Sequence, residues 1–171
     1  MGSSFCEKTL DFLRGGWYSI KTMKLDHTYT VTIENFAFGN IDTNVLIALF
    51  RDGRTCAPFI QQHLPIWFDT LKYVDETGYD HVSGERKFEH KSFTKGGCIF
   101  APSNMVGSGR KINEAVVKQH IEDTKLTYII TDITEFPTIR IRFVDGNKLI
   151  NKYPKCKINS GDKKSFFELT V

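Results

Sequence analysis

The hairpin signal at Val82–Lys87 constrains the fold more than any other part of the sequence. Gly84 stands at the first central position of a two-residue loop, where a type II′ turn requires a positive φ. A turn of this length sets the register of its two strands, because the pairs are counted outward from the loop. The count predicts that Asp80 lies directly opposite Glu89.

The predicted register gathers charged side chains on one face. Opposed residues on antiparallel strands have Cβ atoms roughly 5 Å apart, and Lys91, two residues beyond Glu89, shares their face. Two opposed carboxylates repel each other, and a divalent cation would relieve that repulsion. Mg²⁺ accepts one or two carboxylates plus waters, so Asp80, Glu89 and the backbone carbonyl of His90 are candidate ligands. Lys91 is then placed to orient a water and stabilise developing charge. The alternative interpretation is a solvated charged hairpin.

The segments Gly78–Asp80 and Phe88–Ser92 resemble the active-site segment of the PD-(D/E)xK nucleases, in particular type II restriction endonucleases. The resemblance covers about residues 75–95, with a compatible β-β-α-β order to about residue 133. It implies that Asp80 and Glu89 bind one or two Mg²⁺ ions and that Lys91 is the catalytic lysine.

Two positions next to this segment are less regular. Some members of the family have a further acidic residue shortly before the first ligand, which Glu76 or Asp75 matches. Tyr79 stands where a proline often precedes the aspartate. The resemblance therefore implies Glu76 as a possible additional acidic residue.

The chain has 171 residues, of which 40% are hydrophobic, and its formal net charge is only +3. This size suits one domain, 1–171, with the catalytic core at about 70–135. The resemblance implies an α/β (α+β) fold with a restriction-endonuclease-like core, a central mixed β-sheet flanked by helices. The small net charge does not by itself predict DNA binding. Four scattered cysteines without zinc spacing are expected to be reduced and buried.

Periodicity and breaker residues predict the remaining elements. Helices are expected from Ser4 to Leu13, over Thr55–Leu64, where Pro65 ends the helix, and over Lys111–Lys125. Ile66, Trp67 and Phe68, which follow Pro65, are expected to pack into the core. Strands are expected within Trp17–Phe38, over Asn44–Phe50 as a strand buried on both faces, and over Leu126–Ile133 and Thr138–Val144, with a turn at Asp145-Gly146.

Several polar residues outside the hairpin are candidate DNA contacts. The loop before the third predicted helix offers amides and side chains to phosphates or bases, and two arginines alternate along one strand. These candidates are Lys95, Ser103, Asn104, Ser108, Arg110, Arg140 and Arg142. For each, an ordinary turn or solvated surface is the alternative. The histidines, including His81 and His120, show no ligand spacing and are expected to be structural or exposed.

The leading hypothesis is a cytoplasmic Mg²⁺-dependent type II restriction endonuclease that cleaves double-stranded DNA at a short specific site. A homodimer is expected, because a palindromic site is read most simply by a two-fold protein. A cognate DNA methyltransferase is expected in the same system but not as a stable partner, and no membrane association is expected. The alternatives are a structure-selective nuclease of the Holliday-junction resolvase type and a non-catalytic DNA-binding module.

Overall fold

The computed structural model describes residues 23–168, which form a six-stranded mixed sheet. Its strands are β1 (Thr28–Thr32), β2 (Lys72–Glu76), β3 (Tyr79–Ser83), β4 (Arg86–Phe93), β6 (Thr127–Asp132) and β7 (Thr138–Asp145). They lie in the order β1-β7-β6-β4-β3-β2, and only the β4–β6 pair is parallel. The predicted mixed α/β fold with a central sheet and flanking helices is confirmed.

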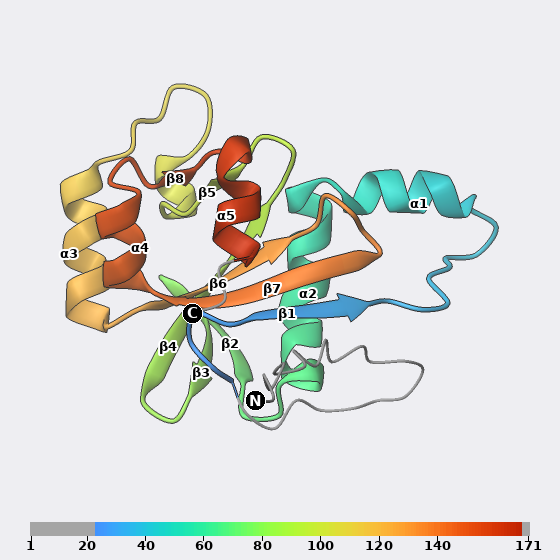
Figure 1. The fold of residues 1–171 in the computed structure, drawn as a ribbon, viewed down its shortest axis with the longest axis horizontal. Helices are drawn as coiled ribbons and strands as arrows, with labels where there is room; N and C mark the ends of the chain where they lie inside the picture. The colour runs from blue at the N-terminus through green and yellow to red at the C-terminus, as the bar shows by residue number, and fades with distance from the viewer. Residues whose placement is uncertain (1–22, 169–171) are drawn as a thin grey trace, which may run out of the picture.

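Helices cover both faces of this sheet (Figure 1). They are α1 (Thr43–Phe50), α2 (Gly53–Trp67), α3 (Glu114–Thr124), α4 (Gly146–Lys152) and α5 (Lys163–Glu168), with short 3₁₀ turns η1 (Ser103–Met105) and η2 (Ser160–Asp162). One core cluster packs α2 against Phe88 and Ile129, and the other packs α3, α4 and α5 against Tyr128 and Ile130. Successive residues of β6 thus enter opposite cores, which explains why the whole strand is buried.

Side-chain caps set where four helices begin. Asp42, Asp52, Asn113 and Asp145 each accept a hydrogen bond from a backbone N–H in the first turn of the helix that follows. Asp145 therefore starts α4, and the predicted turn at Asp145-Gly146 is wrong.

The predicted strand at Asn44–Phe50 is also wrong, because this segment forms α1. Only Leu46 of the helix is buried. A short apolar run has no periodicity that distinguishes a strand from a helix, and the N-cap at Asp42 settles the conformation.

The expected helix at Thr55–Leu64 is confirmed within α2, which continues through Pro65 to Trp67. Phe68 is buried as expected, whereas Ile66 is exposed. The helix predicted over Lys111–Lys125 is α3, and the strands predicted over Leu126–Ile133 and Thr138–Val144 are β6 and β7.

Within the predicted extended region Trp17–Phe38, the described strand is β1 alone, and Ile33 to Phe38 lie outside it. The predicted helix from Ser4 to Leu13 lies outside the described residues, and so does Cys6. The other three cysteines are free and buried, as expected.

A two-stranded ribbon of β5 (Cys98–Ile99) and β8 (Lys157–Ile158) lies beside the sheet, at the start of the long connection from β4 to α3. Gly97 makes this approach possible: its φ is +90°, and a Cβ there would lie 2.2 Å from the carbonyl oxygen of Ile158. Among residues 23–168, no helix has the length and apolar character needed to cross a bilayer.

Candidate active site on the β3–β4 hairpin

The hairpin has the predicted register. Gly84 has a φ of +59°, as the turn requires. The observed pairs are Ser83 with Arg86, Val82 with Lys87 and His81 with Phe88. The turn residues therefore place Asp80 and Glu89 on adjacent strands.

Asp80 departs from simple cross-strand pairing. The regular β3–β4 ladder ends at the pair of His81 with Phe88. The predicted pair of Asp80 with Glu89 is therefore not formed. Instead, Asp80 Oδ2 accepts a hydrogen bond of 2.8 Å from the backbone N–H of His90. This bond holds the Asp80 carboxylate against the strand that carries Glu89 and Lys91.

Glu89 and Lys91 form a close ion pair at the same place. Lys91 Nζ lies 2.6 Å from Glu89 Oε1, and the two side chains are only 15% and 16% exposed. Burial raises the pKa of Glu89; Lys91 opposes this shift and the negative charge on Asp80 adds to it. A cation near both carboxylates would therefore stabilise the ionised form of Glu89.

His90 projects to the face of the sheet opposite Glu89 and Lys91. Its ring is buried, and Nε2 lies 2.8 Å from Thr131 Oγ1 on β6. Its Nδ1 and that of neighbouring buried His81 have no hydrogen-bond partner in the structure. Burial lowers the pKa of His90 to about 3, so the folded protein keeps this ring neutral.

This neutral ring predicts acid sensitivity. Between about pH 6.5 and pH 3 the unfolded chain binds a proton at His90 that the folded chain does not, so stability is lost as pH falls through this window. The expected loss is up to about 1.4 kcal/mol per pH unit. Urea unfolding of wild type and His90→Gln between pH 7 and pH 4 measures it. The variant is expected to lose stability less steeply, and parallel curves would contradict the prediction.

The donor set fits a hard divalent cation. Asp80 and Glu89 supply two carboxylates, the number that Mg²⁺ takes from a protein when waters and phosphate oxygens complete its shell. Among the described residues, no three His, Cys, Asp or Glu side chains gather into a metal-binding group. Glu76 is exposed at the end of β2, paired with Tyr79, and does not join the two carboxylates in such a group. The His90 carbonyl stays a predicted ligand.

The structure places His120 near Asp80 and Glu89, which the sequence did not predict. His120 of α3 packs on the β2–β3 turn, with Nε2 3.4 Å from the carbonyl oxygen of Gly78. A Cβ on Gly78, whose φ is +89°, would lie only 2.9 Å from the imidazole. His120 also acts electrostatically on Glu89, where it favours the ionised carboxylate. This contact depends on how α3 packs on the sheet, and residue spacing carries no signal for it.

The other five candidate DNA contacts lie along the β4–α3 connection. Lys95 is exposed in the turn between Thr94 and Gly97, Ser103 and Asn104 lie in η1, and Ser108 is exposed. Arg110 closes its own loop, because Nη1 donates to the carbonyl oxygens of Ser103 and Val106. The expectation that the loop through Arg110 leads directly into the helix is wrong, since α3 begins at Glu114 with Asn113 as its cap.

The two strand arginines are engaged within the protein. Arg140 donates through Nε and Nη2 to Asp132 Oδ2, at 3.1 and 2.7 Å, and Lys163 Nζ lies 3.3 Å from the same oxygen. Burial raises the pKa of Asp132, but hydrogen bonds from Thr134 and Arg140 outweigh it and leave the pKa lowered. Arg142 is buried, against the expectation of a solvent-facing position, and its guanidinium lies over the ring of Phe166. Both guanidinium groups are therefore engaged in contacts within the protein.

No family model, curated protein or solved structure matches the chain. The residues of the hairpin and their geometry therefore carry the functional inference.

Proposed function

We propose that the protein is a Mg²⁺-dependent DNA endonuclease whose active site is formed by Asp80, Glu89 and Lys91. The observation that carries the proposal is that two carboxylates and a lysine lie close together. Lys91 Nζ is 2.6 Å from Glu89 Oε1, and Asp80 accepts a hydrogen bond from the backbone N–H of His90, the residue between Glu89 and Lys91. Burying charged groups carries a desolvation cost, and a carboxylate whose pKa is shifted by burial and by neighbouring charges, as the pKa of Glu89 is, is typical of functional sites.

The three side chains have distinct parts in phosphodiester hydrolysis. Asp80 and Glu89 would hold the metal, which when bound polarises the scissile phosphate and acidifies a water. Lys91 orients the attacking water and stabilises the negative charge that develops on the phosphate oxygens. The attacking water releases a proton to solvent and its oxygen bonds to phosphorus as the bond to the leaving oxygen breaks, and the leaving oxygen takes up a proton from solvent.

The order of the elements supports this proposal. Strands β3 and β4, helix α3 and strand β6 come in the order that the resemblance to PD-(D/E)xK nucleases implies, with the short elements β5 and η1 between β4 and α3. Strand β6 lies beside β4, which carries Glu89 and Lys91. On this basis we propose a restriction-endonuclease-like core and, as the substrate, double-stranded DNA with a short specific site. A homodimer would cut both strands, and a cognate methyltransferase would protect the host DNA.

Cleavage assays test the proposal directly. Purified protein with Mg²⁺ is expected to convert unmethylated phage DNA into discrete bands, and chelation of the metal should abolish them. Cleavage confined to a four-way junction would instead indicate a structure-selective nuclease. Intact DNA of both kinds with every divalent metal tried, together with measurable DNA binding, would favour the non-catalytic module and reject the nuclease.

A further inference from the structure

The face of β4 that carries the candidate active site also carries a lysine that the proposed reaction does not use. Phe88 is buried in the same core cluster as α2, so the alternation along the strand places Lys87, Glu89 and Lys91 on the opposite face. Lys87 is two residues nearer the hairpin tip than Glu89, which corresponds to about 7 Å along the strand. It therefore lies beside the site without being part of it.

A second lysine lies on the same face of the sheet. Val82 of β3 pairs with Lys87 of β4 on one side and with Lys72 of β2 on the other. Paired residues share a face, and neighbouring strands are about 4.8 Å apart, so the backbones of the two lysines are about 10 Å apart. Lys72 is exposed and Lys87 is partly buried. Near the hairpin tip, the face that carries Glu89 thus presents two ammonium groups.

These two lysines are not neutralised within the part of the chain that the structure describes. Lys91, Lys148 and Lys163 each pair with a carboxylate, but none of the ion pairs among residues 23–168 includes Lys72 or Lys87. The Lys87 ammonium instead lies over the ring of Tyr79, 4.8 Å from its centroid. This cation–π contact holds the ammonium in place and leaves its N–H donors available to an anion. Ordering the side chain in advance lowers the entropy that is lost on binding.

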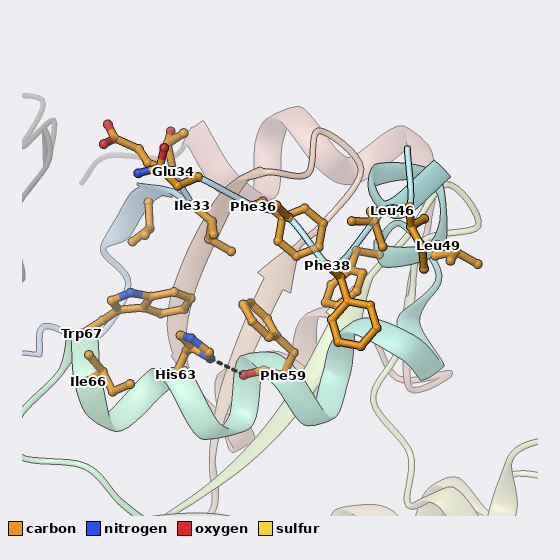
Figure 2. Close-up of a pocket in the computed structure, with 16 residues that line it drawn as sticks. Ile33, Glu34, Phe36, Phe38, Leu46, Leu49, Phe59, His63, Ile66 and Trp67 are labelled. Atoms are coloured by element: carbon orange, nitrogen blue, oxygen red, sulfur yellow. Dashed lines mark hydrogen bonds between the residues drawn. The ribbon is translucent and has the colours of Figure 1, made fainter. Parts of the chain in front are cut away.

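The apolar groove between α1, α2 and the segment after β1 offers no comparable place for an anion (Figure 2). It has a volume of about 970 Å³ and is lined by rings such as those of Phe36, Phe59 and Trp67. Among its lining residues, the only Asp, Glu, Lys or Arg is Glu34. A nucleic acid needs basic groups for its phosphates, and the hairpin face offers such groups where this groove does not.

We infer that Lys87 and Lys72 bind backbone phosphates next to the scissile one. Because the Lys87 ammonium is held at Tyr79, on the tip side of Glu89, it meets a neighbouring phosphate and leaves the scissile phosphate to Asp80, Glu89 and Lys91. The DNA would then extend from the active site over β4, β3 and β2 toward the hairpin tip. These contacts act through charge and do not depend on base sequence. The inference rests on the proposed nuclease function and assigns binding residues to its substrate.

Fluorescence anisotropy with a short DNA duplex of mixed sequence, in EDTA so that no cleavage occurs, tests these contacts over a range of salt concentrations. Lys87→Gln and Lys72→Gln are each expected to reduce the slope of log Kd against log salt by about 1, because each removes one phosphate contact. Each should also raise Kd by about 5- to 10-fold at low salt. Lys87→Arg keeps the charge and is expected to retain the wild-type slope.

Arg86→Gln is the matched control. Arg86 precedes Lys87 in the same strand and is exposed, but the alternation places its side chain on the opposite face. Its removal changes the net charge by the same amount and should leave the salt slope unchanged. Circular dichroism and thermal melting establish that all the variants are folded.

Two results would overturn the inference: an unchanged salt slope in Lys87→Gln, or an equal reduction in Arg86→Gln, which would indicate a general effect of net charge. Single-turnover cleavage with Mg²⁺ adds a second readout. Lys87→Gln is expected to cleave at the wild-type rate at saturating DNA and more slowly below saturation, whereas wild-type cleavage at every DNA concentration would reject the contact and leave the nuclease intact. If the salt slope falls in Lys87→Gln but wild type cuts no DNA, the phosphate contact stands and the nuclease proposal fails.

Discussion

Replacing Glu89 by glutamine is expected to lower the rate of Mg²⁺-dependent DNA cleavage by about 10³-fold or more. The substitution keeps the size of the side chain but removes the negative charge that would hold the cation and that now pairs with Lys91 at 2.6 Å. Because the change also removes repulsion from phosphates, DNA binding is expected to persist. Single-turnover cleavage and a filter-binding assay on the same substrate separate the two effects.

The chain offers a matched control for this substitution. Glu122 and Lys118 form a glutamate–lysine pair on α3, 3.9 Å apart, with both side chains about half exposed. Such a surface pair contributes little to stability, so Glu122→Gln should cleave at the wild-type rate. Undiminished cleavage by Glu89→Gln, or equal losses in both variants, would rule out the proposed role of Glu89.

The largest loss of stability is expected from Phe143→Ala, at about 3–5 kcal/mol. Phe143 of β7 is fully buried and makes edge contacts with the rings of Tyr29, Phe68 and Phe88, which come from β1, the end of α2 and β4. Its removal would leave a cavity between three elements that pack on the same face of the sheet. A domain of this size has a total stability of only about 5–15 kcal/mol, so the variant would be close to unfolding.

Urea denaturation measures this effect. Val116→Ala, which truncates a half-exposed side chain, is the control and should change the free energy of unfolding by about 0.5 kcal/mol or less. A loss below about 1 kcal/mol for Phe143→Ala would mean that the surrounding rings collapse into the space, contrary to the close, poorly adaptable packing that is general in protein cores.

The sequence predicted best where local chemistry decides the conformation. Gly84 with its positive φ fixed the hairpin register, and the alternating pattern of Thr138–Val144 matches β7. The sequence-based prediction failed where a short apolar segment suits a strand and a helix equally well, as for Asn44–Phe50, which forms α1. The aspartates at positions 42 and 145 are N-caps, but the same residue type also begins turns, so their role depends on the segment that follows.

The candidate site shows the same division. The turn at Gly84 sets the pairing of β3 with β4 as far as His81 and Phe88, which the sequence predicted, but the predicted pair of Asp80 with Glu89 is not formed. The hydrogen bond from the His90 backbone N–H to the Asp80 carboxylate replaces the regular ladder on the side of His81 that is away from the turn. No local sequence rule predicts this change. Likewise, the burial of Arg142 and the approach of His120 to Gly78 depend on packing between distant segments.

The pairing of β1 with β7 has a consequence for how the protein is made. Thr32 and Thr138, which share a hydrogen bond across these strands, are 106 residues apart in the chain. During synthesis Thr32 of β1 is translated 106 residues before Thr138 of β7, so β1 leaves the ribosome well before its partner strand. Until then Tyr29 and Val31 lack the strand against which they are buried, and such exposed segments are prone to aggregation. Translation that stops before β7 would leave one edge of β6 open and β1 without its partner, so a nascent chain of this protein is expected to depend on chaperones until β7 has been synthesised.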